Sequence, residues 1–264
     1  MVDLGETDEK TEGPKEFSRA LADGSHGRAK EKTVSKKYSR TGKPVHGLRR
    51  RSRKPEDAER VSEDIERYPS TTRFVESSLG IKSYSELAPY LAKGVEKVMA
   101  QLLQLKPDEL TVTPEFICKL HKDAFGELFP SWAGRYRDRN VTVSNHTPPQ
   151  YFEIPVLMRQ YCADLESRLS IMGAKPPVTN SLLETLAFAE GRLLSIHPFL
   201  DFNGRVARML LFALLYRLDL PPVQLVPDED SENEKTEYLN ALSEADYFNW
   251  QPLIIWEKRF GLKE

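Results

Sequence analysis

The sequence predicts a mostly α-helical protein, a helical bundle that carries one small β-hairpin. Apolar residues recur at spacings of three and four over several long segments, which places them on one side of a helix. The alternation of apolar and polar residues that is typical of a strand is convincing only over residues 140–147. The chain has 264 residues, of which 39% are hydrophobic, and this is enough for one well-filled core.

The first 60 residues are expected to form a basic, disordered arm that precedes a helical domain over residues 61–264. Between Gly27 and Lys54 lie twelve Lys or Arg residues and a single acid, although the net charge of the whole chain is only −2. Such a segment cannot bury enough apolar surface to become ordered. The arm could bind nucleic acid or an acidic partner, act as a nuclear address, or serve only as a solubilising leader.

Four segments carry the helical periodicity in the second part of the chain. Pro114 suits the first turn of one helix, and Pro198 disfavours helical geometry at His197, so another helix should end there. The last of the four is apolar almost all round, which predicts a helix in the middle of the bundle. These helices are expected over residues 84–105, 113–128, 182–196 and 206–218.

The one strand signal, residues 140–147, reads Asn-Val-Thr-Val-Ser-Asn-His-Thr. Its period of two and its turn residues predict a short β-hairpin. Because an isolated hairpin is a weak structure, we expect this one to lie against the helical body.

The segment between the last two helices gathers groups that suit phosphate. A helix start near Asn203 and Gly204 would present free N–H groups and the positive end of the helix dipole to an anion. Arg205 and Arg208 are three residues apart, so both planar guanidinium groups lie on one face of the first turn and can grip successive phosphates. The ordinary alternative is that both arginines line a solvated helix face.

Two further side chains of this segment would supply acid–base and metal chemistry. His197, at the mouth of the loop, could take a proton from an attacking hydroxyl group, and Asp201 could hold Mg²⁺ together with phosphate oxygens. Taken alone, a histidine before proline is usually structural, and a loop aspartate is usually a turn residue. We favour a joint site because each residue fills a different role at one phosphate.

Residues 197–208 resemble the signature of the Fic family, His-x-Phe-x-Asp/Glu-Gly-Asn-Gly-Arg-x-x-Arg. Phe202 stands where the pattern has glycine, the residue that adopts positive φ most freely, so we expect the loop to be altered slightly. The resemblance extends over residues 70–257 and includes a Trp-Ala-Gly-x-x-Arg turn at 132–137. The matching signature residues are His197, Phe199, Asp201, Asn203, Gly204, Arg205 and Arg208.

Fic proteins typically transfer AMP from ATP to a hydroxyl side chain of a target protein, with Mg²⁺. The resemblance implies that His197 is the general base, Asp201 the Mg²⁺ ligand and Phe199 a core anchor of the loop. It also implies a phosphate-binding group in which the two arginines neutralise the β- and γ-phosphates. That group would be Phe202, Asn203, Gly204, Arg205 and Arg208.

In Fic proteins a hairpin at the position of residues 140–151 is the flap that aligns the target by strand addition, a mode in which main-chain hydrogen bonds supply affinity. The target-docking residues would be Val141, Thr142, Val143 and Ser144. The expected partners are ATP and a protein substrate, with a homodimer as a further expectation.

Residues 70–80 contain a candidate inhibitory helix. Thr72 and Glu76 are four residues apart and would share a helix face, as in the Fic inhibitory motif Ser/Thr-x-x-x-Glu-Gly/Asn. Ser77 departs from the last position of that motif. The resemblance implies that Glu76 pairs with Arg208 and denies it to the γ-phosphate; the alternative is an exposed helical glutamate.

Two other classes of function remain open. The same fold could use UMP, phosphocholine or a phosphate donor, or could remove AMP from proteins. A non-enzymatic module that binds nucleotide or nucleic acid is the third alternative. Two isolated cysteines, the lack of a signal-like N-terminus and the lack of a membrane-length apolar run predict a cytoplasmic protein, or a nuclear one in a eukaryote.

Overall fold

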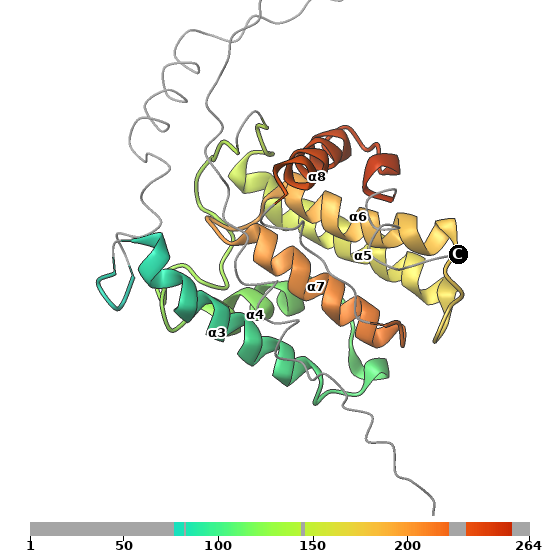
Figure 1. Cartoon of the computed structure of the whole chain (residues 1–264), viewed down its shortest axis with the longest axis horizontal. Helices are drawn as coiled ribbons and strands as arrows, with labels where there is room; N and C mark the ends of the chain where they lie inside the picture. Colours follow the sequence, from blue (N-terminus) through green and yellow to red (C-terminus); the bar gives the residue numbers. More distant parts are fainter. Residues whose placement is uncertain (1–76, 82, 144–145, 222–230, 255–264) are drawn as a thin grey trace, which may run out of the picture. The chain divides into compact units, whose positions relative to one another are not determined.

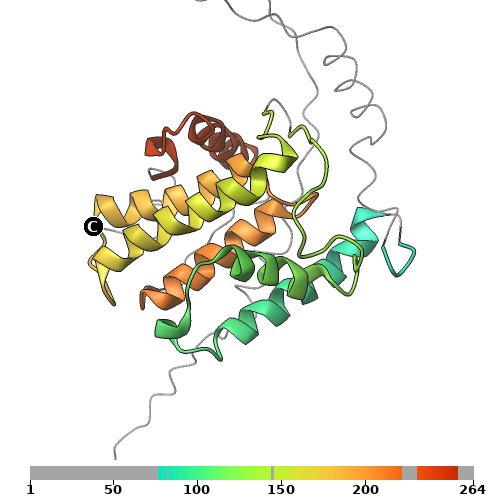
Figure 2. The same cartoon turned by 180° about the vertical axis from the view of Figure 1, so that it is seen from behind.

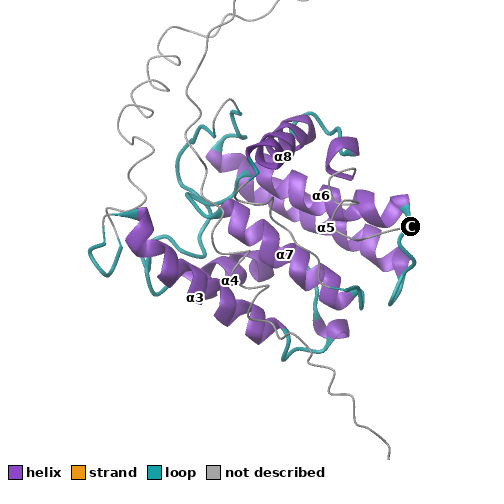
Figure 3. Cartoon of the chain, in the orientation of Figure 1, coloured by secondary structure: helices purple, strands orange, loops and turns teal. Residues whose placement is uncertain are grey.

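Helices form most of the chain that the computed structural model describes, which comprises residues 77–81, 83–143, 146–221 and 231–254. The mostly α prediction is therefore confirmed (Figure 3). The basic arm, Thr72, Glu76 and Ser144 lie outside the described residues. The α-helices are α3 (Tyr84–Leu102), α4 (Pro114–Phe125), α5 (Ile154–Met172), α6 (Asn180–Ile196), α7 (Asn203–Arg217) and α8 (Glu232–Ala245), with short 3₁₀ turns η2 (Pro107–Glu109) and η3 (Tyr151–Glu153).

Side-chain caps fix where several of these helices begin. The hydroxyl oxygens of Thr113, Thr179 and Ser231 accept hydrogen bonds from backbone N–H groups of the first turns of α4, α6 and α8. Such a cap stabilises a helix by about 1 kcal/mol. Pro114 occupies the first position of α4, as the sequence predicts, because its missing N–H needs no partner there.

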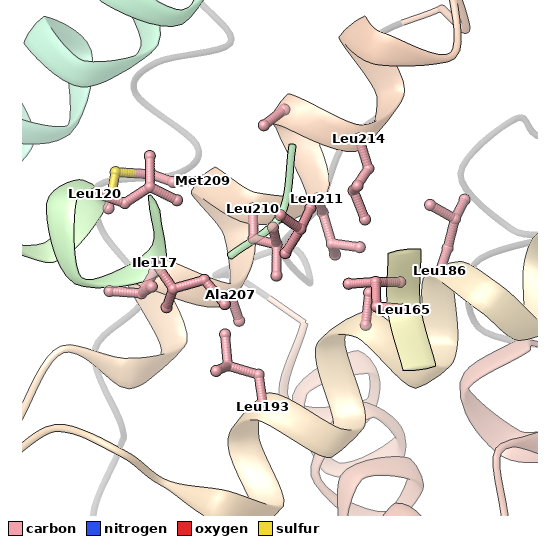
Figure 4. Close-up of a cluster of buried hydrophobic side chains, with 14 of the residues drawn as sticks. Ile117, Leu120, Leu165, Leu186, Leu193, Ala207, Met209, Leu210, Leu211 and Leu214 are labelled. Carbon is pink, nitrogen blue, oxygen red and sulfur yellow. The ribbon is translucent and has the colours of Figure 1, made fainter. Parts of the chain in front are cut away.

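Helix α7 lies at the centre of the bundle. It packs against α3 and α4 on one side and against α6 on the other, an arrangement that both views show (Figures 1 and 2). Its side chains Leu210, Leu211 and Leu214 meet those of the neighbouring helices in the core (Figure 4). The prediction from its all-round apolar sequence is thus confirmed, and the N-terminus of this buried helix carries the site described below.

Helices α5 and α8 complete the bundle by packing on α6. Gly191 of α6 makes the close approach of the C-terminal elements possible. A Cβ atom at this position would lie 2.8 Å from the Ala245 Cβ and 2.9 Å from the Trp250 ring. Because those atoms belong to a packed interface, a larger residue at position 191 would push α8 away from α6.

The predicted hairpin is present only as a single antiparallel bridge between Val143 and His146. The two residues exchange backbone hydrogen bonds of 3.0 and 2.8 Å. The described residues contain no longer strand, so the strand prediction is not confirmed beyond this bridge (Figure 3). Side-chain contacts hold the ends of the segment instead, since the Asn140 amide donates to Gln150 Oε1 at 2.6 Å and accepts from the Tyr151 N–H at 3.1 Å.

In the described ranges, no helix combines the length and the apolarity that a bilayer span requires.

Candidate active site

His197 ends helix α6 in a left-handed backbone conformation, with φ 50° and ψ 61°. Its N–H still donates to the Leu193 carbonyl at 3.0 Å, so the chain leaves the helix directly at the histidine. Pro198 disfavours continuation of the helix, as the sequence predicts. The residue is half-buried, and a left-handed backbone at a non-glycine residue marks a position that the surrounding structure holds in place.

Arg137 supplies that support, and sequence reasoning assigned it no role. Its guanidinium donates to the carbonyl oxygens of His197 (2.8 Å), Arg139 (2.9 Å) and Pro149 (2.5 Å), and its own N–H donates to the Pro198 carbonyl at 2.9 Å. Burial lowers the pKa of Arg137 to about 10. One buried cation therefore joins the His197 loop to both ends of the flap segment.

Asn203 closes the loop on itself. Its side-chain oxygen accepts the Phe199 N–H, and its amide donates to the Phe199 carbonyl, both at 2.9 Å. The buried side-chain amide of Asn203 is therefore already used within the loop, and the expected contact with phosphate falls to its backbone. Only its backbone N–H, at the first position of α7, is placed to meet an anion.

Phe202 also differs from the role expected of it. Its backbone keeps the positive φ that a glycine would adopt, 61°, and it caps the start of α7. Its side chain is only 4% exposed and packs on the rings of Phe125, Phe129 and Trp132, with centroid distances of 4.5, 5.3 and 5.7 Å. The aromatic ring therefore anchors the loop in the core, while the backbone keeps the left-handed conformation that a glycine would allow.

His121 supports the same loop from helix α4. Its Nδ1 accepts the Gly134 N–H at 2.8 Å, so the proton is on Nε2, which donates to the Asp201 carbonyl at 3.2 Å. The ring stacks on Phe199 with a centroid distance of 4.1 Å, and Phe199 itself is fully buried, as expected of a core anchor. Burial lowers the pKa of His121 to about 4, which keeps the ring neutral.

Asp201 offers a carboxylate beside the start of α7. Its Oδ1 accepts the Phe202 N–H at 2.7 Å, and the residue is half-buried. The described residues contain no group of three or more His, Cys, Asp or Glu side chains that could hold a metal by themselves. One carboxylate next to a phosphate site fits Mg²⁺, which is usually held by one or two carboxylates together with substrate phosphates.

Arg205 and Arg208 are both 94% buried, which excludes the alternative that they line a solvated face. Arg205 donates from Nη2 to the Tyr84 hydroxyl of α3. Arg208 folds back over the first turn of α7, since its Nη1 lies 3.6 Å from where a Cβ on Gly204 would be. Burial is the main cause that lowers the pKa of Arg208, and the nearby positive charge of Arg205 lowers it further.

Arg208 forms no hydrogen bond or ion pair with another residue of the described part of the chain. A buried cation of this kind is costly unless an anion neutralises it. The start of α7 adds N–H groups that have no acceptor within the helix. The arrangement is therefore complementary to a negatively charged ligand such as a chain of phosphates.

A buried acid, Glu190 of α6, lies in the electrostatic surroundings of Arg208. It is 1% exposed, and its Oε1 accepts the Tyr238 hydroxyl of α8 at 2.6 Å. Burial raises the pKa of Glu190. The sequence analysis gave this residue no role. Its position was nevertheless informative, because a charged side chain within the apolar helix 182–196 needs a buried partner.

With this geometry in place, comparison with known proteins identifies the fold and its family. The family model described as "Fic/DOC family" matches residues 111–215, which include α4 to α6, most of α7 and all of the loop from His197 to Arg208. The part of this chain that carries the site belongs to the Fic/DOC family. The resemblance read from the signature is thereby confirmed, and the residue roles above can be compared with those of Fic relatives.

Two of the similar curated relatives carry the name protein adenylyltransferase Fic. The protein from Nematostella vectensis is 31% identical over 180 residues, which cover 67% of this chain and 39% of the relative. The protein from Drosophila willistoni is 28% identical over 183 residues, which cover 69% of this chain and 33% of the relative. The matched part of the chain thus spans about two fifths or less of the length of these relatives.

Solved structures show the same fold. Fic-1 from C. elegans matches with a TM-score of 0.54 and 24% identity, over 69% of this chain and 51% of that chain. The BepC protein from Bartonella tribocorum, solved with bound AMPPNP, matches with a TM-score of 0.54 and 21% identity, over 73% of this chain and 94% of that chain.

Proposed function

We propose that this protein transfers AMP from ATP to a hydroxyl side chain of a target protein, a Tyr, Ser or Thr residue. The observation that carries the proposal is Arg208, a buried guanidinium over the first turn of α7 that forms no ion pair with the residues that the structure describes. A triphosphate is the natural complement of two adjacent buried arginines at a helix N-terminus. The name that the curated relatives share, protein adenylyltransferase, supports the same activity.

The proposed reaction follows from the order of groups along the loop. The N–H groups of the first turn of α7 bind phosphate, and Arg205 and Arg208 neutralise the charge of the β- and γ-phosphates. His197 takes the proton of the target hydroxyl, whose oxygen bonds to the α-phosphorus while the bond from that phosphorus to the β-phosphate oxygen breaks. Pyrophosphate leaves. Mg²⁺, held by Asp201 and phosphate oxygens, would stabilise the charge on the leaving group.

Arg137 has a positioning role in this scheme. By donating to the His197 carbonyl it holds the backbone of the base, and by donating to Arg139 and Pro149 it holds the two ends of the flap. The hydroxyl group and the base must be aligned before proton transfer, and small displacements are costly to the rate. One side chain that fixes both segments would keep that alignment.

The flap would bind the target by pairing its backbone with that of an added strand. Val141 is half-buried and Thr142 is exposed. The N–H and carbonyl groups of Val143 already pair with His146, so the added strand would pair with its neighbours. Main-chain pairing places few demands on the target sequence. This is consistent with a transferase that selects its target partly through surfaces beyond the flap.

Autoinhibition by Glu76, with Thr72 on the same helix face, is part of the proposal. Support comes from the residues that follow directly. Ser77 is buried, and the Ser78 N–H donates to the Leu128 carbonyl at 2.8 Å. Ser78, two residues after Glu76, is thus hydrogen-bonded to Leu128. The next residue, Phe129, packs on Phe202 of the active-site loop.

The test uses ATP labelled at the α-phosphate, Mg²⁺ and cell lysate, with the full chain. Wild type is compared with His197→Ala and Glu76→Gly by gel and intact mass, and Glu86→Gly, at an exposed glutamate early in α3, is the matched control. We expect protein-bound AMP that increases in Glu76→Gly, is unchanged in Glu86→Gly and is lost in His197→Ala. Labelling that persists in His197→Ala would overturn the assignment of the base.

Parallel reactions with labelled UTP, CDP-choline and γ-labelled ATP test the other donors. Transfer from one of them in the absence of AMP transfer would replace the proposed donor and keep the site.

A homodimer, an intracellular location and contacts of the basic arm with nucleic acid or an acidic partner stay predictions. For the arm, binding of nucleic acid should weaken steeply with salt and be lost when residues 1–60 are deleted.

A further inference from the structure

His146 joins the flap to two helices that are not part of it. Its Nδ1 lies 3.1 Å from Asp246 Oδ2, at the C-terminal cap of α8, and its Nε2 lies 2.9 Å from the carbonyl oxygen of Ser195, near the end of α6. Its backbone pairs with Val143 of the predicted docking strand. Ser195 is two residues before His197, so this one ring connects the flap to the segment that ends in the base.

Both ring nitrogens of His146 face groups that accept hydrogen bonds. A carbonyl oxygen can only accept, and an ionised carboxylate can only accept, whereas a neutral imidazole has one N–H and one lone pair. Both contacts can form together only if the ring carries two protons or if Asp246 carries one. The complete contact therefore holds one proton more than a separate neutral histidine and ionised aspartate.

The surroundings of the pair favour the uptake of this proton. The side chains of His146 and Asp246 are 22% and 17% exposed. Burial raises the pKa of the Asp246 carboxyl, while the charge of His146 and a hydrogen bond with the Ser195 side chain oppose that rise. The Asp246 carboxyl group is therefore protonated more readily than that of an exposed aspartate. When it is ionised, it needs the charged His146 ring beside it.

The other charged groups of the neighbouring elements are engaged elsewhere. On α6, one turn before Ser195, the guanidinium of Arg192 lies 4.9 Å from the centre of the Phe248 ring. At the base of the flap, Asp138 and Arg139 form an ion pair with each other at 2.8 Å. In the part of the chain that the structure describes, neither His146 nor Asp246 has a second ion-pair partner.

We propose that His146 and Asp246 form a proton-dependent contact that holds the flap in position, so that docking of the protein target weakens as pH rises while ATP binding does not. The positioning role rests on the proposed function; the contact itself does not. His146 acts here through the backbone at Val143, not on the reacting atoms.

The sign of the effect follows from the proton count. The contact takes up a proton when it forms, so it is complete at low pH and is lost as pH rises through the pKa of the joined pair. Asp246→Asn provides a diagnostic variant. An asparagine amide can donate to Nδ1 of a neutral ring while Nε2–H still donates to the Ser195 carbonyl, so this variant should keep both contacts at high pH.

The first measurement needs no target. Amide exchange of Val143 and the ¹⁵N shifts of the His146 ring are followed from about pH 6 to about pH 8.5 in the full chain. The exchange rate is first corrected for its intrinsic rise with pH. The protection factor of the Val143 N–H should then fall with pH in wild type, stay high in Asp246→Asn and be low at every pH in His146→Ala. Asp108→Asn, at an exposed acid of η2, should behave as wild type. Equal protection in wild type and Asp246→Asn at every pH would overturn the proposal.

The second measurement tests the positioning role with the lysate proteins that wild type labels. At limiting lysate concentration, labelling by His146→Ala should fall about tenfold or more, the effect of one lost charge-assisted hydrogen bond. Release of AMP from ATP without lysate should stay as in wild type. The ratio of labelling to this AMP release should fall with pH in wild type and stay constant in Asp246→Asn. Unchanged labelling by His146→Ala would refute the positioning role. No labelling by any variant would remove the proposed function, and with it this role, while the exchange result still decides on the contact.

Discussion

At the scale of single residues, Phe202 shows that burial can outweigh backbone strain. A left-handed conformation costs a non-glycine residue about 1–2 kcal/mol. Removal of a buried phenylalanine ring costs roughly 3–5 kcal/mol. Phe202→Gly restores the residue of the Fic signature, yet we expect it to destabilise the fold by about 1–4 kcal/mol, the difference between the two effects. Denaturant unfolding checks this value, and a variant at least as stable as wild type would contradict it.

Gly204 should respond in the opposite way. A Cβ at this position meets only Arg208 Nη1 at 3.6 Å, an ordinary contact, so the folded protein tolerates alanine. Alanine in a helix is favoured over glycine by about 0.5–1 kcal/mol. We therefore expect Gly204→Ala to be as stable as wild type or more stable, while its affinity for ATP falls about tenfold or more because the methyl group keeps phosphate from the backbone. Thermal unfolding and calorimetric titration with ATP separate the two effects. Loss of stability, or unchanged ATP affinity, would refute this reading of the glycine.

The sequence predicted which residue types meet at the site, but not how the loop uses each of them. The buried positions of Arg205 and Arg208 could be anticipated from their place at the start of an apolar helix. The Asn203 amide could not, because its bond to the Phe199 backbone depends on the loop conformation. Phe202 could not either, since its aromatic neighbours come from a segment some 70 to 80 residues earlier in the chain.

At the scale of elements, Arg137 makes the flap and the His197 loop one unit. Lysine keeps the charge but has one nitrogen on a flexible stem, which cannot donate to three carbonyl oxygens in a fixed fork. We expect Arg137→Lys to lower AMP transfer by about a hundredfold, the effect of misplaced reacting groups, with a smaller loss of ATP affinity. Arg135→Lys, at an exposed position of the same turn, is the control. Equal losses of transfer in the two variants would show that the fork of Arg137 has no special role.

The hydrogen bond between Glu190 of α6 and Tyr238 of α8 predicts that the free energy of unfolding depends on pH. Burial raises the pKa of Glu190, so its neutral form is favoured in the folded state. The stability associated with this group is fully present below its unfolded pKa of 4.5 and is lost as pH rises through the higher folded value. Glutamine keeps an oxygen for the Tyr238 hydroxyl without the charge. Glu190→Gln should therefore be more stable than wild type at pH 7.5 and equal to it near pH 4.5, which unfolding curves at the two values check. An advantage that is the same at both values would indicate a cause other than titration.

The long helices were predictable because their one-sided or all-round apolar patterns extend over several turns. The flap was not, because its alternation is short and its position depends on contacts from other elements. Arg137, the Asn140 amide and His146 hold residues 140–151 through side chains and carbonyl groups, and none of these contacts has a period that a sequence pattern can display. Local pattern thus predicts an element only where that element carries its own hydrogen bonds.

At the scale of the whole molecule, the site is assembled from separate parts of the bundle around the buried start of α7. Tyr84 of α3 contacts Arg205, and the charges of Glu190 of α6 and Tyr238 of α8 act on Arg208. Filling this site with an anion should therefore couple several helices. A ligand that binds only the folded state at a hundred times its Kd adds about 2.7 kcal/mol of stability.

Thermal unfolding with ATP and Mg²⁺ tests how charge is balanced at this centre. Mg²⁺ alone should leave Tm unchanged, since Asp201 is a single carboxylate in the described site and provides no complete metal cage. ATP alone should raise Tm because its phosphates bring negative charge to buried Arg208, and Mg²⁺ with ATP should raise it further, by about 5–10 °C in total near saturation. Asp201→Asn should keep the response to ATP and lose the additional response to Mg²⁺, whereas Arg208→Ala should lose most of both. A rise in Tm with Mg²⁺ alone in wild type would place the metal at residues other than those that meet the nucleotide.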